Sequence, residues 1–175
     1  MKNWKSFTAA ALATLAVAAG CGMGAGDYET YRVAFSDSTL SESCGADSED
    51  STTFRTGNTF LLYFVGTESG DIPYLDVGGS VLEGTETDDG YAFSGTSKDV
   101  EDNGDSVTTT TTTIDITLIP DGDSISGTQK VRVSLSCDGD CQGFDGFDCT
   151  GTSDFLGVVV DETIEVGTDD GNANP

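Results

Sequence analysis

The sequence contains no histidine, and its seven Lys and Arg residues are far outnumbered by 31 Asp and Glu residues. Without histidine, the chain cannot form a Ser-His-Asp or Cys-His nucleophile system or a histidine-liganded metal site. The formal net charge of -24 argues against a nucleic-acid partner, because phosphate backbones are bound by Lys and Arg. At 175 residues the chain fits a single domain, alone or with a targeting segment.

The sequence also has no apolar run long enough to span a bilayer. Its longest apolar stretch covers residues 7–19, is interrupted by Thr8 and Thr14, and follows the positive residues Lys2 and Lys5. A transmembrane helix takes roughly 20 apolar residues, so this stretch predicts a signal peptide over residues 1–20.

The segment Ala18-Ala19-Gly20-Cys21 that ends this stretch resembles the lipobox of bacterial lipoproteins, Leu-(Ala/Ser)-(Gly/Ala)-Cys, with Ala in the Leu position. The resemblance covers residues 1–21. It implies diacylation of the Cys21 thiol, cleavage before Cys21 and acylation of the new amino terminus. Gly22, in place of Asp, implies delivery to the outer membrane, on either face. The alternative is a plain secretory signal with Cys21 in a disulfide.

The other four cysteines, Cys44, Cys137, Cys141 and Cys149, form an even set. Thiols of an exported protein are expected to be oxidised, and the spacing C-x₃-C-x₇-C of the last three fits no zinc pattern. We therefore predict two disulfides. Three connectivities are possible, and each bonds Cys44 to the 137–149 loop.

The chain shows the two-residue alternation of β-strands and, after the signal, no helical periodicity. Phe60–Val65 is a continuous apolar run, and threonines lead into the alternating Ile114, Ile116 and Leu118. Turn sequences containing Asp-Gly or Asn-Gly join neighbouring strands and predict a meander. Eight strands are expected, at residues 28–37, 51–56, 59–66, 80–87, 91–100, 106–119, 123–136 and 150–166.

These strands predict an all-β fold, an antiparallel meander closing into a lipocalin-like barrel, with a two-sheet sandwich as the alternative. Gly-Thr pairs in or beside strands are typical of the kinks that let a sheet curl. The expected organisation is a signal (residues 1–20), a flexible tether (21–26), one β-domain (27–166) and a disordered acidic tail (167–175).

The loop between Cys137 and Cys149 carries four aspartates, which are weak calcium candidates: Asp138, Asp140, Asp145 and Asp148. Hard oxygen ligands on a loop suit Ca²⁺, but the twelfth position counted from Asp138 is Cys149, where an EF-hand needs a Glu. A solvated acidic loop is the favoured interpretation, and no cofactor is expected. Phe144 and Phe147 are expected to fold back over the barrel mouth, with a partner-binding surface as the alternative.

The favoured function is a non-enzymatic structural or interaction module of the cell envelope, held to the membrane by a lipid. The alternative is a carrier whose barrel lumen binds a small hydrophobic ligand. An enzyme with paired carboxylates, such as a glycosidase, is disfavoured because such domains are typically larger. The acids lie in nearly every loop, which favours a solvated surface over one cation site.

Overall fold

The structure is a computed structural model that describes residues 23–44, 54–144 and 146–160. These residues include no helix with the length and apolar character needed to cross a membrane. They form strands β1 (Tyr28–Phe35), β2 (Thr39–Leu40), β3 (Thr59–Thr67), β4 (Gly70–Asp76), β5 (Val81–Glu86), β6 (Tyr91–Asp102), β7 (Ser106–Asp121), β8 (Ser124–Gly139) and β9 (Phe147–Val159).

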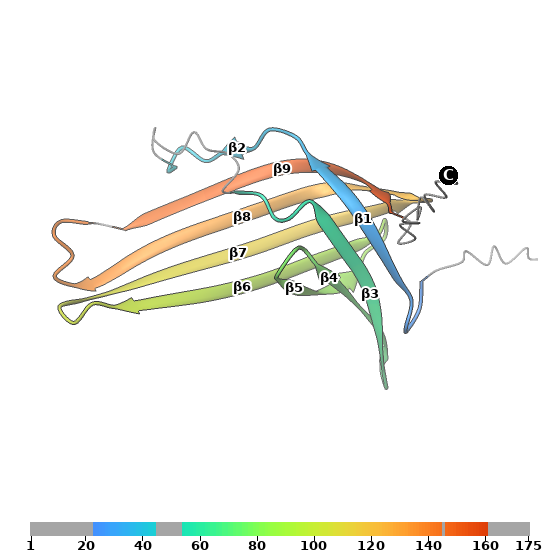
Figure 1. Cartoon of the computed structure of the whole chain (residues 1–175), viewed down its shortest axis with the longest axis horizontal. Helices are drawn as coiled ribbons and strands as arrows, with labels where there is room; N and C mark the ends of the chain where they lie inside the picture. The colour runs from blue at the N-terminus through green and yellow to red at the C-terminus, as the bar shows by residue number, and fades with distance from the viewer. Residues whose placement is uncertain (1–22, 45–53, 145, 161–175) are drawn as a thin grey trace, which may run out of the picture.

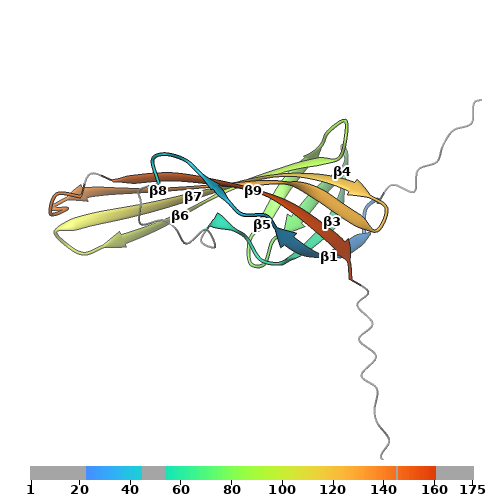
Figure 2. The same cartoon turned by 90° about the horizontal axis from the view of Figure 1, so that it is seen from above.

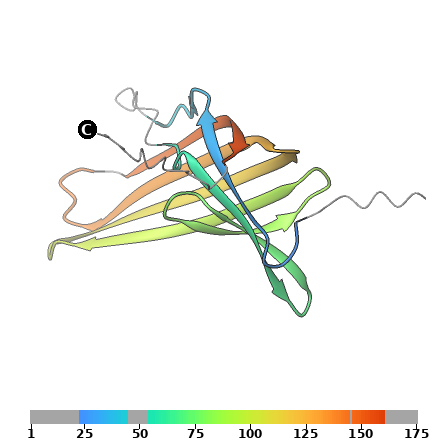
Figure 3. The same cartoon turned by 45° about the vertical axis from the view of Figure 1, so that its right-hand side comes forward.

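All strands pair antiparallel in one sheet, in the order β1-β3-β4-β5-β6-β7-β8-β9-β2. The strand β1 closes this sheet into a ring because it has two neighbours. Residues Tyr28 to Arg32 pair with β3, and residues Tyr31 to Phe35 pair with β9. Figures 1 and 3 show β1 crossing between these two strands. The prediction of an all-β antiparallel meander that closes on itself is confirmed, although the strands of the ring do not stand evenly round one axis.

The last four long strands extend beyond the ring and form a projection that we call the blade (residues 97–102, 106–113, 132–139 and 147–149). In Figure 1 these strands run side by side to the left, and Figure 2 shows them on one side of the molecule, with β1, β3 and β5 on the other. The ladder between β7 and β8 runs for 16 residue pairs, through ring and blade. At about 3.3 Å per residue, the eight blade residues of β7 project roughly 25 Å.

Seven of the eight predicted strands match strands of the structure, and the strand predicted at 51–56 is wrong for its described residues. Residues 54–56 belong to no strand, and residues 51–53 lie outside the described residues. In its place the structure has β4, in which Pro73 breaks the expected strand pattern. Pro73 pairs with Phe64 of β3 but lies outside the ladder to β5, where its missing N–H costs no hydrogen bond. The short β2 was also not predicted.

The ends of the predicted domain also differ in detail. Residues 23–26, assigned to the tether, are part of the fold: Met23 packs against the core, and the Gly26 amide donates to the Phe64 carbonyl at 3.1 Å. The signal peptide, the predicted strand end at 161–166 and the predicted tail 167–175 lie outside the described residues.

The interior of the ring is filled by alternate side chains from its strands. Each of the following is at most 5% exposed: Tyr31, Val33, Phe60, Leu62, Phe64, Leu75, Val77, Leu82, Phe93, Ile116, Leu118, Ile125 and Phe155. Among the described residues these side chains pack against one another and fill much of the interior of the ring. This packing favours a filled core over the open lumen of the carrier hypothesis.

Glycines in the strands make room for these large side chains. A Cβ added to Gly151 would lie 2.5 Å from the Phe54 Cβ. A Cβ added to Gly127 would lie 1.9 Å from the Thr117 carbonyl oxygen and 2.7 Å from the Phe155 ring. Gly84 and Gly95 leave similar space for Phe93 and Leu82. The Gly-Thr pairs thus let bulky residues fill the interior of the ring.

A second cluster lies where the ring meets the blade. It contains the buried residues Cys44, Phe54, Val131 and Cys149. Beside it, the side chain of Gln129 is buried and holds the 54–56 segment: its Oε1 accepts from the Thr56 hydroxyl at 3.0 Å, and its Nε2 donates to the Phe54 carbonyl at 3.4 Å. This segment closes the end of the ring nearest the blade.

The glycine packing predicts that Gly127→Ala lowers the free energy of unfolding by roughly 1–3 kcal/mol, since the added methyl forces β7 or Phe155 to move. Urea unfolding measures the effect. The control is Ser126→Ala, the neighbouring outward-facing position, for which we expect a change within about 0.5 kcal/mol. Equal stability of the Gly127→Ala variant and the wild type would contradict the packing described.

Candidate functional site

A cleft of about 300 Å³ lies at the tip of the blade. The start of β7, the end of β8 and the loop between β8 and β9 surround it. Its lining residues are Ser106, Thr108, Leu135, Cys137, Asp140, Cys141, Gln142 and Phe144. The cleft therefore combines hydroxyl, amide and carboxylate groups with an aromatic ring, at the end of the molecule farthest from the ring of strands (Figure 1).

Covalent and hydrogen bonds hold the loop over the cleft. The disulfide Cys137–Cys141 ties the loop to the end of β8. The Asp140 amide donates to the Asp105 carbonyl at 2.9 Å, and the Phe144 amide donates to the Cys141 carbonyl at 3.0 Å. Gln142 has a left-handed backbone with φ of 51°, which is uncommon for a residue other than glycine. The side chains of the loop are thus presented on a braced backbone.

The four cysteines of the domain are paired, as predicted, and the structure selects one of the three connectivities. Cys44 bonds to Cys149, and Cys137 bonds to Cys141. The first bridge joins the segment after β2 to β9, and the second is confined to the tip. Disulfides are typical of compartments outside the cytoplasm, so the pairing indicates a non-cytoplasmic location.

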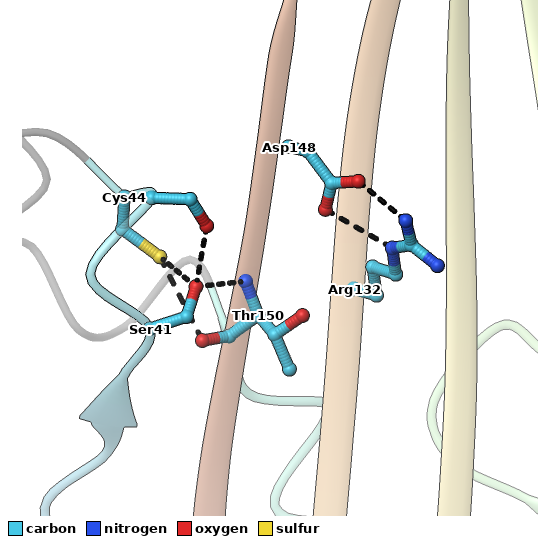
Figure 4. A network of polar contacts seen from close by, with 6 residues as sticks. Ser41, Cys44, Arg132, Asp148 and Thr150 are labelled. Carbon is cyan, nitrogen blue, oxygen red and sulfur yellow. Dashed lines mark hydrogen bonds and ion pairs between the residues drawn. The ribbon is translucent and has the colours of Figure 1, made fainter.

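The polar network in Figure 4 fixes the region where the first bridge meets β9. The Thr150 amide donates to the Ser41 hydroxyl at 3.1 Å, and this hydroxyl lies 3.2 Å from the sulfur of Cys44. Nearby, Arg132 of β8 makes a two-pronged ion pair with Asp148, including a 3.0 Å bond from its Nε. The hydrogen bonds from Arg132 lower the pKa of the Asp148 carboxyl.

The structure does not bring the calcium candidates together. Asp138 and Asp140 are exposed near the tip, Asp148 is paired with Arg132, and Asp145 lies outside the described residues. Residues 23–44, 54–144 and 146–160 contain no group of three or more metal-ligating side chains placed to share an ion.

The expected position over the barrel mouth is wrong for Phe144, because its loop stands at the far end of the blade. Phe147 is half-buried against the second cluster, whereas Phe144 is 43% exposed and lines the cleft. The exposed ring agrees with the alternative of a contact surface.

Sequence reasoning missed the partners of Phe144 in the cleft, although the turn at Asp121-Gly122-Asp123-Ser124 carried the signal. The pairing of Asp121 with Ser124 fixes the register of the whole β7–β8 ladder. That register places Thr108 opposite Cys137. Extended over 16 residue pairs, it would have predicted a hydroxyl-lined tip beside the cysteine loop.

The outer wall of the ring carries an exposed apolar region. Leu156 is 69% exposed and separates two shallow grooves of about 770 and 660 Å³, to which Ala34 and Ser126 contribute as well. Val158 and Ile119 border the same region and are also exposed. Small residues between these aliphatic side chains create the grooves.

The most strongly perturbed tyrosine belongs to the interior of the ring. Tyr31 is 1% exposed, and its hydroxyl donates to Glu29. Burial, and then the hydrogen bond and the negative charge of Glu29, raise the pKa of Tyr31 well above its ordinary value. Burial likewise raises the pKa of Tyr91. These tyrosines lie away from the tip cleft and act in packing.

Comparison of the chain with protein-family models, with curated proteins and with solved structures found no match.

The two disulfides should differ in their contribution to stability. Cys44 and Cys149 are separated by 105 residues, and Cys137 and Cys141 by four. The loop-closure relation gives roughly 4–5 kcal/mol for the long loop and about 2 kcal/mol for the short one. In urea unfolding we expect Cys44→Ala/Cys149→Ala to be clearly less stable than Cys137→Ala/Cys141→Ala. The reverse order would contradict the assigned pairing.

Alkaline pH should weaken the fold through Tyr31. Unfolded tyrosine loses its proton near pH 10, whereas the folded pKa is higher. The contribution of Tyr31 to the free energy of unfolding is therefore complete below about pH 10, and it is lost as the pH rises towards the pKa of Tyr31 in the folded state. We expect the free energy of unfolding to fall more steeply above pH ~10 in the wild type than in Tyr31→Phe. Equal slopes would show that Tyr31 titrates normally.

Proposed function

We propose that the chain is a lipid-anchored, non-enzymatic binding module of the bacterial cell envelope, which presents the tip of its blade to a partner. The observation that carries this proposal is the pairing of Cys44, Cys137, Cys141 and Cys149 with one another. Cys21, the fifth cysteine of the sequence, lies outside the described residues and is not needed for either bridge. A cysteine in that position, after a signal-like segment, is the residue that bacterial lipoproteins acylate.

The arrangement of the domain supports display away from the membrane. Met23, only two residues after Cys21, packs against the core of the ring, so a lipid on Cys21 would lie within about 7 Å of it along the chain. The tip of the blade, whose residues line the cleft, lies at the opposite end of the ribbon from the ring (Figure 1). An anchor at the ring would thus leave the blade free to point outward.

The charge of the chain supports the lipid as the means of membrane attachment. After removal of Lys2 and Lys5 with the signal, five basic residues remain against 31 acidic ones. Such a surface is repelled by anionic headgroups, so attachment by a basic patch is disfavoured. Acyl chains contribute about 0.8 kcal/mol for each buried CH₂, which makes multiple acylation a lasting anchor. Gly22 after the cysteine favours the outer membrane.

Metabolic labelling with an alkyne palmitate analogue tests the anchor in a bacterium that processes lipoproteins. We expect the full chain to be labelled and to enter the detergent phase in a two-phase separation. Cys21→Ser should remove the label and leave the chain in the aqueous phase. Cys44→Ala/Cys149→Ala is the matched control, because it removes two cysteines and should retain the label. An unlabelled wild type, or a label that persists in Cys21→Ser, would overturn the proposal.

A further inference from the structure

The cleft at the blade tip has the composition of a site for a small hydroxylated ligand. We propose that it binds one neutral sugar ring of a glycan. This inference rests on the proposed role as a binding module, but it does not depend on the lipid anchor.

The polar lining of the cleft matches the hydrogen-bonding needs of a sugar. Each sugar hydroxyl both donates and accepts, and so do the hydroxyls of Ser106 and Thr108 and the amide of Gln142, whereas the Asp140 carboxylate only accepts. These groups come from two separate segments, the start of β7 and the tip loop, and together they line one open, shallow cleft. They can therefore satisfy several hydroxyls of one ring at once.

The apolar lining provides the other contact that a sugar ring makes. Phe144 keeps 43% of its surface exposed in a loop otherwise rich in Asp and Gly, and Leu135 and the Cys137–Cys141 disulfide line the same cleft. The C–H face of a pyranose is apolar and packs on an aromatic ring, while its edge carries hydroxyls. An exposed aromatic beside convergent polar groups is the usual pattern of a small-molecule site.

Charge and size narrow the ligand further. None of the described residues that line the cleft is a Lys or Arg, the side chains that bind phosphate, sulfate or carboxylate groups. Repulsion from the acidic chain would also oppose an anionic ligand. A volume of about 300 Å³ is at the lower limit of ligand pockets. It corresponds to one sugar ring, with the adjoining sugars of the glycan in solvent. A neutral sugar within a longer chain fits these limits.

The bracing of the loop favours binding by a preformed site. The Cys137–Cys141 bridge and the hydrogen bond from Asp140 to the Asp105 carbonyl at 2.9 Å hold the backbone that carries Gln142 and Phe144. A ligand then orders few additional bonds on binding, which reduces the entropic cost. The bridge is thus part of the proposed site.

Titration by solution NMR tests the proposal with the full mature chain in dodecylphosphocholine micelles, a detergent without a sugar headgroup. The probes are neutral trisaccharides of glucose, galactose, mannose and N-acetylglucosamine, and a cationic glucosamine trimer for comparison. We expect at least one neutral probe to shift the amide signals of residues 140–144, with a Kd of about 1 mM or tighter.

Variants connect this binding to the cleft. Phe144→Ala should weaken the binding of the neutral probe about tenfold. Phe144→Trp should bind the probe as the wild type does. Asp140→Asn, which keeps the shape of the side chain, should weaken it severalfold. The matched control is Val100→Ala, because Val100 is a similarly exposed apolar residue on the blade outside the cleft lining. Urea midpoints close to that of the wild type show that each variant is folded.

Three results would overturn the proposal. The first is the absence of any shift at residues 140–144 with every neutral probe at 10-fold above the expected Kd, about 10 mM. The second is equal binding by Phe144→Ala and the wild type. The third is a preference for the glucosamine trimer that disappears with added salt, which would indicate attraction to the acidic surface. Palmitate labelling is measured separately, so a failure of the glycan site and a failure of the anchor remain distinct.

Discussion

The pairing of β1 with both β3 and β9 is the constraint on which the rest of the molecule depends. Five residues of β1 pair with each neighbour, so the ring closes over a short length of strand. The long ladders of β6 to β9 extend well past that closure, and within residues 23–44, 54–144 and 146–160 no further strand pairs across from them there. A ring with a filled interior and a projecting blade is the geometric result of joining short strands to long ones.

The surroundings of the inward-facing residues change along the strands from the ring to the tip of the blade. Inside the ring, residues such as Ile116 and Ile125 pack against the opposite wall and are buried. Farther along the same strands, Cys44 and Phe54 cover the inward face near Val131. Beyond that cover, Thr108 and Leu135 reach the tip and line a cleft. One periodic pattern thus produces core, junction and candidate site in turn, according to what lies opposite.

Sequence patterns predicted the fold class well where apolar residues alternated over a long stretch, as in residues 125–135, and where they formed a continuous run, as in Phe60–Val65. They failed at β4, whose Pro73 is tolerated only because one side of the strand is unpaired there. The loss of one predicted strand and the gain of β4 cancelled, so six strands still separate the segment of Cys44 from the tip. The candidate site could be predicted only from the register of the β7–β8 ladder, which places Thr108 beside the cysteine loop. The exposure of Phe144 could not be predicted, because it depends on how far the blade extends beyond the ring.

Ring closure between the first and last long strands has a consequence for how the chain folds during synthesis. Residue Phe35 pairs with Phe155, so closure waits until nearly the whole domain has emerged from the ribosome. Contacts of such high sequence separation slow folding. Before these contacts form, the edges of β1 and β9 that face each other in the closed ring remain unpaired. An unclosed sheet of this kind offers two free edges to other chains, which makes prompt closure a protection against aggregation.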